Sequence, residues 1–309
     1  MVKKKSILIG LGNIGLNYDL NTQYIMTHAK SLLKNKNVKF ICGIDKSINQ
    51  RKIFNKRYKI PSFAKINDIE ILKSNFIILS TPNHTHLKYI QKILLYRNIK
   101  TILLEKPGGS NFNDFKYIKY LCKKKGVKLY INYQRLYDKN YLKIKNIFNK
   151  MTNFKGVVNY SRGLENNCGH VLSLFEKFNL KKTKIILLNK KENPDFFIKF
   201  RKGQILFLNN PRKDISNNEF ELVSRNYKIK SFNEMNKFSI FKIQKDRYIK
   251  KNYVFSNKSN IIEFDQKNSQ KSVLDVILRG NKTLYKDILE NSYNTFKLIN
   301  KIRFMVKSN

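Results

Sequence analysis

The chain has 309 residues, of which 41% are hydrophobic, so it is long enough to bury the cores of two domains. No apolar run approaches the roughly 20 residues that a membrane-spanning helix needs, so the sequence predicts no membrane span. The three cysteines, Cys42, Cys122 and Cys168, include no CxxC pair. Their spacing argues against a disulfide framework and against a zinc site, and we expect a protein of the reducing cytoplasm.

The formal net charge of +42 raises the question of a nucleic-acid-binding protein. However, the 63 Lys and Arg residues are spread over the whole length and are not gathered in one arm. Tryptophan is absent and alanine occurs only at positions 29 and 64, a composition typical of AT-rich codon usage. We therefore expect a solvated basic surface and no specific nucleic-acid partner. The field of this surface should still attract anionic ligands such as nucleotides.

The first part of the chain alternates between strand and helix patterns, which is typical of a parallel α/β sheet. Strands are predicted at residues 6–10, 39–45, 75–80, 101–104 and 127–132, with a short extended piece at 60–63. Helical spacing covers residues 53–58, 85–95 and 112–125. The last of these helices has Ser110 or Asn111 as its cap and Gly126 as its stop.

Beyond residue 132 the pattern changes from alternating elements to a succession of strands. A helix at 137–150 and another at 169–178 accompany strand segments at 157–161, 183–188, 195–200, 204–208, 220–223, 228–232 and 238–243. Several strands without intervening helices predict an open, largely antiparallel sheet. Residues 273–278 and 284–304 are predicted as helix and loop. We therefore expect two domains, residues 1–130 and 131–309.

A glycine-rich turn, Gly10-Leu11-Gly12-Asn13-Ile14-Gly15, follows the first strand. Glycines at this spacing allow a tight turn, backbone approach to a pyrophosphate and close helix packing, and the helix that follows offers free N–H groups to the anion. The motif alone is a weak signal, because glycine-rich turns are common. Its place between a strand and an α/β unit favours dinucleotide binding.

The acidic residue expected at the end of the second strand is Asp45. It lies 30 residues beyond Gly15, whereas about 20 is usual, and the segment from Leu16 to Thr27 looks like an insertion that explains the delay. An aspartate here hydrogen-bonds the adenosine ribose and repels a 2′-phosphate, which favours NAD. Because Lys46 and Ser47 next to it could accept a phosphate, NADP is not excluded.

Four further polar motifs are candidates for a functional site. Three of them follow predicted strands, and the fourth lies in the second half of the chain. Each could also have a purely structural role. They are Ser80-Thr81-Pro82-Asn83-His84-Thr85-His86, Glu105-Lys106-Pro107, Asn132-Tyr133-Gln134-Arg135 and Asn166-Asn167-Cys168-Gly169-His170. Asn83 alone would be a helix cap, Lys106 a solvated charge and His170 a structural histidine. The first three gain weight because the carboxyl ends of parallel strands lie at one edge of a sheet, where ligands bind.

In this order the motifs resemble the glucose–fructose oxidoreductase, inositol dehydrogenase and related (Gfo/Idh/MocA) family over nearly the whole chain. The most specific parts are Thr81–His86, Glu105–Pro107 and Tyr133–Arg135, and Ser272–Gly280 is similar to the family's closing helix. The resemblance implies an N-terminal NAD(P)-binding Rossmann domain with a parallel sheet. It also implies an α+β C-terminal domain with a large open, mainly antiparallel sheet, which binds substrate and forms a homo-oligomer, a dimer or tetramer.

The resemblance also implies roles for individual residues. The catalytic residues would be Lys106 and His170. The cofactor would contact Gly10, Gly12, Asn13, Ile14, Gly15, Asp45, Thr81, Pro82, Asn83, His86, Glu105 and Lys106. The substrate would contact Lys106, Tyr133, Arg135, Asn166 and His170, and no metal is expected.

The implied reaction is hydride transfer between nicotinamide and a hydroxyl-bearing carbon of a sugar, polyol or nucleotide-sugar, in a setting such as surface-polysaccharide synthesis. Lys106 is the expected acid/base, with His170 hydrogen-bonding the reacting hydroxyl. Two positions depart from the family, because Asn166 and Ser173 replace common aspartates. An asparagine cannot hold a proton as a carboxylate can. The alternative is therefore a catalytically silent dinucleotide-binding sensor or scaffold.

Overall fold

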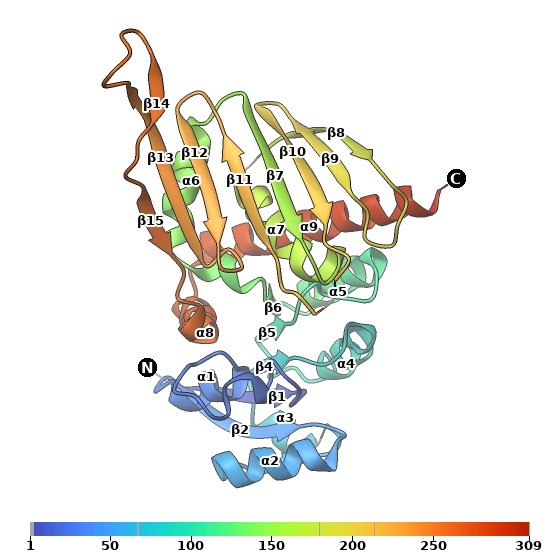
Figure 1. Ribbon diagram of the computed structural model, residues 1–309. Helices are drawn as coiled ribbons and strands as arrows, with labels where there is room; N and C mark the ends of the chain where they lie inside the picture. The colour runs from blue at the N-terminus through green and yellow to red at the C-terminus, as the bar shows by residue number, and fades with distance from the viewer. Residues whose placement is uncertain (1–2, 67, 179, 213, 309) are drawn as a thin grey trace. The chain divides into compact units, whose positions relative to one another are not determined.

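The computed structural model describes residues 3–66, 68–178, 180–212 and 214–308. It divides into two compact units, and neither is one continuous segment (Figure 1). The first consists of the chain up to Tyr137 together with Gln266–Tyr293, and the second of Asp138–Asp265 together with the residues from Asn294 on. Within the described ranges, no helix is long and apolar enough to cross a membrane.

The first unit is built on a six-stranded parallel sheet of strand order β3-β2-β1-β4-β5-β6 (Figure 1). Its strands are β1 (Lys4–Ile9), β2 (Val38–Ile44), β3 (Ser62–Phe63), β4 (Phe76–Leu79), β5 (Thr101–Leu104) and β6 (Lys128–Ile131). Its helices are α1 (His28–Lys34), α2 (Ile48–Tyr58), α3 (Asp68–Leu72), α4 (His86–Ile93), α5 (Phe112–Lys124) and α8 (Ser269–Arg279). Helix α9 (Lys282–Lys307) begins in this unit and continues into the second.

The short central strands are buried on both faces, as continuous aliphatic runs predict for a parallel sheet. Every residue of β4 and β5 is buried. Helix α5 begins where the sequence predicts, because the Asn111 side chain accepts a hydrogen bond from the N–H of Asp114 at 2.9 Å. It ends before Gly126, whose φ of +67° lies in the left-handed region.

Helix α1 continues the turn of the glycine-rich motif after an insertion. The N–H of His28 donates to the carbonyl of Ile14, and the N–H of Ala29 donates to that of Gly15. Each bond joins residues 14 apart in sequence, ten more than in a continuous α-helix, where the separation is four. The N–H of Leu16 still donates to the carbonyl of Gly12 in the ordinary helical way. Ten residues are therefore looped out of one helix, which confirms the predicted insertion.

The inserted loop is held by a buried carboxylate. Asp19 is fully buried, and its side chain accepts the N–H groups of Met26 and Thr27 at 2.7 and 2.8 Å and the Thr27 hydroxyl at 2.8 Å. Lys30 of α1 lies 3.7 Å from the same carboxylate and donates to the backbone of the loop. These contacts place Thr27 as the N-cap of α1, so the helix restarts in register.

The observed units differ from the expected division, which placed residues 1–130 in one domain and residues 131–309 in another. Gln266–Tyr293 belongs to the first unit because α8 and the start of α9 bond to it. The carbonyl of Lys267 accepts the N–H of Ile25, and the Tyr285 hydroxyl accepts the N–H of Leu129. These contacts join segments more than 150 residues apart, which no local sequence pattern reveals.

The second unit contains a nine-stranded sheet of order β14-β13-β12-β11-β7-β10-β9-β8, with β15 paired to β13 (Figure 1). All its strand pairs are antiparallel except β7 with β10. Its strands are β7 (Phe154–Tyr160), β8 (Lys182–Leu187), β9 (Phe196–Phe200), β10 (Gly203–Asn209), β11 (Glu219–Val223), β12 (Tyr227–Phe232), β13 (Lys237–Lys245), β14 (Tyr253–Phe255) and β15 (Asn260–Glu263). The predicted fold class, a Rossmann domain plus an α+β domain with an open sheet, is confirmed.

Helix α7 (Gly169–Lys177) packs against one face of this sheet, and helix α6 (Asn140–Lys150) packs against α7, where the rings of Phe148 and Phe175 lie 6.0 Å apart. The Phe175 ring of α7 lies 6.2 Å from that of Phe207 in β10 and 5.5 Å from that of Phe220 in β11. Along β7 the exposure alternates, with Val158 buried and Val157 exposed. The sheet is therefore covered by helix on one face and open on the other.

Candidate functional site

The glycines of the first turn serve two different purposes. A Cβ on Gly10 would lie 2.6 Å from the backbone of Ser80, and one on Gly15 would lie 2.2 Å from the carbonyl oxygen of Gly10. Both glycines therefore allow close backbone packing. A Cβ on Gly12 would meet nothing within 4 Å. Gly12 faces open space, so its missing side chain leaves room for a ligand.

The turn also offers backbone donors. Among the described residues, the N–H groups of Gly12, Asn13 and Ile14 donate to no protein acceptor. Free N–H groups in a glycine-rich turn that begins a helix fit the diphosphate of a dinucleotide. The residues present thus fit the cofactor that the sequence predicts.

Asp45 follows β2 at the same edge of the sheet. Its carboxylate accepts the N–H of Leu11 at 2.7 Å and that of Ser47 at 2.8 Å, while Arg51 donates to its backbone carbonyl. The side chain is partly exposed. Asp45 is therefore fixed against the glycine-rich turn, where a ribose would lie in a Rossmann domain.

The Thr81-Pro82-Asn83 turn after β4 is stabilised by a buried histidine. His86 is fully buried, and its Nε2–H donates to the carbonyl of Thr81 at 2.8 Å. Burial lowers the pKa of His86, against the opposing effect of this bond and of Glu105. The fully buried ring of His86 supports the turn, and a contact between His86 and the cofactor stays a prediction. Thr81 and Pro82 remain accessible.

The hydrogen bonds between neighbouring parallel strands continue one residue beyond the ends of β5 and β6. They therefore hold the first residue of two predicted motifs at the edge of the sheet. The N–H of Glu105 donates to the carbonyl of Leu79 at 3.0 Å, and the N–H of Asn132 donates to that of Leu104 at 2.8 Å. Glu105 and Asn132 therefore stand side by side at the carboxyl edge of the sheet. Lys106, next to Glu105, is partly exposed at this edge, and its peptide bond to Pro107 is cis.

Glu105 is held by two side chains. His28 Nε2 donates to its Oε1 at 2.8 Å, and Asn132 Nδ2 donates to the same oxygen at 2.5 Å. Burial raises the pKa of Glu105, but the hydrogen bond and charge of His28, the bond from Asn132 and the charge of Lys106 outweigh it and lower the pKa. The side chain of Glu105 is 13% exposed. An ionised carboxylate thus stands beside Lys106.

His28 was not predicted from the sequence. A histidine that opens a helix after an insertion has no local signal that ties it to a strand 77 residues later. Asn132 was noticed only as the first residue of its motif.

Tyr133 and Arg135, two predicted substrate residues, also lie in the first unit. Tyr133 is fully buried and Arg135 is 8% exposed. Tyr133 lies two residues beyond the end of β6, and Arg135 lies in the short 3₁₀ turn that comes next, Gln134–Tyr137.

The remaining predicted residues lie in the second unit. His170 is the second residue of α7 and is partly exposed, and Asn166 lies exposed on the π-helical turn Leu164–Cys168. Ser173 is buried, and its hydroxyl donates to the carbonyl of His170 at 2.8 Å. Ser173 therefore supports the helix backbone and is not available as a proton carrier.

A polar hollow of about 360 Å³ lies beside Asn166. Arg162, Glu165, Asn193 and Arg303 contribute to its lining, and Arg303 pairs with Glu165. The Asn193 carboxamide oxygen accepts the N–H of Leu164 at 2.9 Å, which fixes the loop. Amide and charged groups of this kind suit a ligand rich in hydroxyls.

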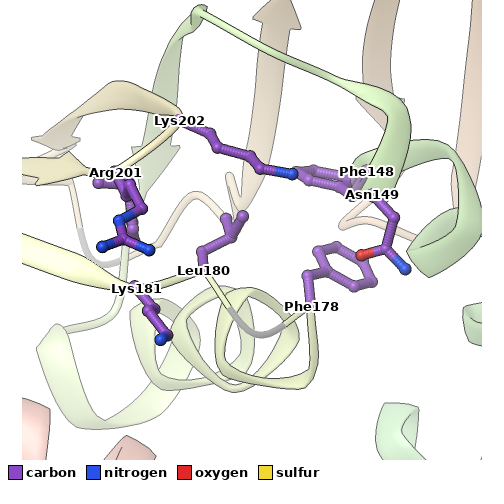
Figure 2. Close-up of a pocket in the computed structure, with 8 residues that line it drawn as sticks. Phe148, Asn149, Phe178, Leu180, Lys181, Arg201 and Lys202 are labelled. Atoms are coloured by element: carbon purple, nitrogen blue, oxygen red, sulfur yellow. The ribbon is translucent and has the colours of Figure 1, made fainter.

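A second hollow, of about 220 Å³, contains none of the predicted site residues (Figure 2). Its wall includes Phe148 and Phe178, whose stacked rings have centroids 4.1 Å apart, and Lys181, Arg201 and Lys202 surround it. Helices α6 and α7 both end at this place. Cations are favoured at helix carboxyl ends, so these charges have a structural explanation.

No cluster of three or more His, Cys, Asp or Glu side chains suited to a metal occurs in the part of the chain that the structure describes.

Comparison with known proteins agrees with this architecture. A model described as "Oxidoreductase family, NAD-binding Rossmann fold" (GFO_IDH_MocA) matches residues 4–133. Among curated proteins, a search by sequence finds no match.

Three solved structures share the fold over nearly the whole chain. A dehydrogenase (MviM) from Clostridium difficile is 15% identical with a TM-score of 0.73, and the match covers 98% of this chain and 99% of that one. KijD10, a 3-ketoreductase from Actinomadura kijaniata solved with NADP and TDP-benzene, is 10% identical with a TM-score of 0.72, covering 98% and 97%. A super-repressor mutant of Gal80p from Saccharomyces cerevisiae is 11% identical with a TM-score of 0.72, covering 99% and 96%.

Identities this low establish the fold alone, and the family model carries the assignment. The match over residues 4–133 identifies this part of the chain as the NAD-binding Rossmann domain of the Gfo/Idh/MocA oxidoreductase family, and the fold of the whole chain is that of the three solved structures.

Proposed function

We propose that the protein is an NAD(P)-dependent dehydrogenase acting on a CH–OH group of a sugar, polyol or nucleotide-sugar. One observation carries the proposal. The open glycine-rich turn at Gly12 and the Glu105–Lys106 pair lie at the carboxyl edge of the same parallel sheet. A dinucleotide bound across this edge would place its diphosphate at the turn and its nicotinamide near Lys106.

The cofactor is proposed to be NAD. The free N–H groups of Gly12, Asn13 and Ile14 would bind the diphosphate, and Asp45 would accept hydrogen bonds from the adenosine ribose. A carboxylate at this position disfavours the 2′-phosphate of NADP. Thr81, Pro82, Asn83 and Glu105 would line the cofactor, and His86 would hold Thr81 in place.

The bound nicotinamide would supply the hydride chemistry. When a hydroxyl-bearing carbon gives up its hydride, the hydroxyl proton must also leave so that a neutral carbonyl forms. Lys106 is proposed to take that proton, and to return it in the reverse reaction. His170 is proposed to hydrogen-bond the reacting oxygen of the substrate.

The substrate is proposed to be a sugar, and a nucleotide-sugar fits the charge of the chain best. The hollow beside Asn166 is lined by amide and charged groups, and the net charge of +42 favours an anionic diphosphate. KijD10 was solved with TDP-benzene, which carries such a group. Tyr133 and Arg135 would contribute from the first unit.

The experiment is to incubate the purified protein and NAD with a panel of sugars, polyols and nucleotide-sugars. Reduced nicotinamide is then followed by absorbance and by fluorescence. The proposal expects turnover with at least one nucleotide-sugar, and it expects NADP to be used less well. Cofactor binding without turnover over the whole panel would contradict it.

The alternative, a silent dinucleotide-binding sensor or scaffold, has two observations in its favour. Asn166 and Ser173 carry no carboxylate, and the Ser173 hydroxyl donates its hydrogen bond to the backbone carbonyl of His170. One protein of the same fold is described as a super-repressor mutant and not as an enzyme. Binding without turnover in the panel would favour this function.

A homo-oligomer is proposed to form through the open face of the large sheet. Strand register places Ile186, Phe197, Leu206 and Val157 in one row across β8, β9, β10 and β7. Ile186 and Val157 are 39% and 37% exposed. An apolar row on an uncovered sheet face favours contact with a second copy.

A further inference from the structure

His28 is a buried polar side chain that joins two halves of the Rossmann domain. It is the first residue of α1, directly after the inserted loop, and its side chain is 1% exposed. Its backbone N–H bonds to Ile14 of the glycine-rich turn, while its ring bonds to Glu105 at the end of β5. One residue therefore contacts both the turn proposed to bind the diphosphate and the segment proposed to face the nicotinamide.

We propose that His28 is a positioning residue for the nicotinamide side of the cofactor site, acting through Glu105. The inference rests on the proposed function, because it assumes that a dinucleotide binds along this edge.

The geometry gives Glu105 one fixed and one available oxygen. Oε1 accepts both His28 and Asn132, at 2.8 and 2.5 Å. No bond from another described residue to Oε2 is present, and the side chain is 13% exposed. Two donors on one oxygen fix the carboxylate plane and leave the other oxygen to face the edge of the sheet. The backbone of Glu105 leads directly into Lys106, so the orientation of the carboxylate and the place of Lys106 are linked.

Asn132 extends this arrangement to α8. Its amide nitrogen also donates to Gln270 Oε1 at 3.2 Å, and Gln270 donates to Gln134 Oε1 at 3.1 Å. Gln270 is 1% exposed and Asn132 is 3% exposed. Because these amides are excluded from water, a change in one of them must be accommodated by the others. Of the two side chains that bond to Glu105, His28 lowers the pKa of the carboxyl more than Asn132 does, so its loss should affect Glu105 most.

Two possible roles of His28 predict different effects on ligand binding, because the two ends of a dinucleotide bind at different strands. Adenosine binds on the β1–β2 side of a Rossmann sheet and nicotinamide on the other side of the crevice. If His28 acts through Glu105, its removal weakens binding of the whole dinucleotide and spares a ligand that lacks nicotinamide. If His28 only supports α1 and the glycine-rich turn, both ligands lose affinity together.

The test uses the full-length protein and two probes, NADH and ADP-ribose, with dissociation constants measured by fluorescence and calorimetric titration. His28→Leu removes the ring donor, and His28→Gln keeps a donor near the same place without the charge. We expect about tenfold weaker NADH binding in His28→Leu and a smaller loss in His28→Gln, because a hydrogen bond to a charged group contributes this much. ADP-ribose affinity should be unchanged in both.

The matched control is His84→Gln, an exposed histidine on the same edge that lies outside this arrangement. Its affinities for both probes should equal those of the wild type. Equal losses for NADH and ADP-ribose in His28→Leu would overturn the inference, and so would no loss for either. If the wild type binds neither probe, the proposed function itself fails, which is a distinct result. If His28→Leu does not fold, the two affinities of His28→Gln decide the question.

Discussion

Gly10 and Gly12 belong to one turn, but the structure gives them different roles, and alanine substitution separates them. Gly10 has a φ of +98° and backbone atoms of Ser80 within 2.6 Å of a Cβ, so Gly10→Ala should destabilise the fold by about 2 kcal/mol or more. Gly12 has open space, so Gly12→Ala should fold with an unchanged melting temperature and bind NADH at least about tenfold more weakly. Thermal melts and titrations measure both quantities. Normal NADH affinity in Gly12→Ala would remove the turn from the proposed site.

Glu105 gives a residue-level prediction about pH. Its pKa is lowered in the folded protein, so its contribution to stability is present above the unfolded pKa of about 4.3 and is lost as the pH falls through the lower folded value. The hydrogen bond and charge of His28, the bond from Asn132 and the charge of Lys106 stabilise the charged form of the carboxylate. Burial raises the pKa of Tyr137, and the nearby Tyr130 and Glu105 raise it further. Denaturant unfolding of the wild type and Glu105→Gln should show a stability gap at pH 7 that narrows below about pH 4. A gap that is independent of pH would contradict this account.

Sequence reasoning found the residues that stand next to strand ends, because a strand end is a local feature. Glu105, Lys106, Thr81 and Asp45 were all located in this way. The partner of Glu105 was not found, because His28 reaches it across 77 residues of sequence. The burial of His86 and its bond to Thr81 were not predicted for the same reason, since burial depends on the whole domain.

At the level of elements, the ten-residue insertion before α1 makes a sharp prediction. Removing Asn17–Met26 would join Leu16 to Thr27 and turn the bonds from His28 to Ile14 and from Ala29 to Gly15 into ordinary helical ones. We expect this variant to fold cooperatively and to bind NADH, although it loses the Asp19 contacts. Circular dichroism melts and titrations would show this.

The control is a deletion of eight residues, Asn17–Tyr24, which leaves two extra residues in the helix. Two residues rotate the following helix by about 200°, because an α-helix has 3.6 residues per turn. This variant should be clearly less stable than the ten-residue deletion. Equal stability of the two deletions would contradict the idea that one helix has been interrupted.

The long, strongly patterned elements were predicted within a few residues, as for β5 and α5. Strands β14 and β15 were missed, because they are only three and four residues long and are largely exposed. Helix α1 was missed because the insertion separates it from the turn that it continues. Short elements depend on tertiary pairing, which a local pattern does not contain.

For the whole molecule, the open face of the large sheet gives a prediction about assembly. Val157→Lys places a charge in the apolar row with Leu206 and Phe197, and desolvating that charge between two copies would be costly. We expect light scattering to show an oligomer for the wild type and a smaller species for Val157→Lys. Leu95→Lys, at a side chain that is 76% exposed in the first unit, is the matched control and should leave the oligomer intact. A monomeric wild type would contradict the proposed assembly.

The division of the chain was the feature of the whole molecule least accessible from sequence. A change of pattern near residue 130 was visible, but Gln266–Tyr293 returns to the first unit through contacts such as that of Tyr285 with Leu129. The chain crosses between the units three times, and no linker rich in Gly, Pro or Ser marks these crossings.

The central proposal is that Lys106 accepts and returns the hydroxyl proton of the substrate, and a nicotinamide would supply the hydride chemistry when bound. The most direct measurement is the turnover and NADH affinity of Lys106→Ala, beside Lys88→Ala, an exposed lysine on α4, as the matched control. The account predicts that Lys106→Ala lowers kcat by about 10²–10⁴-fold and leaves NADH affinity nearly unchanged, because general acid–base catalysis contributes that much. Lys88→Ala should behave as the wild type. Full turnover in Lys106→Ala would contradict the account.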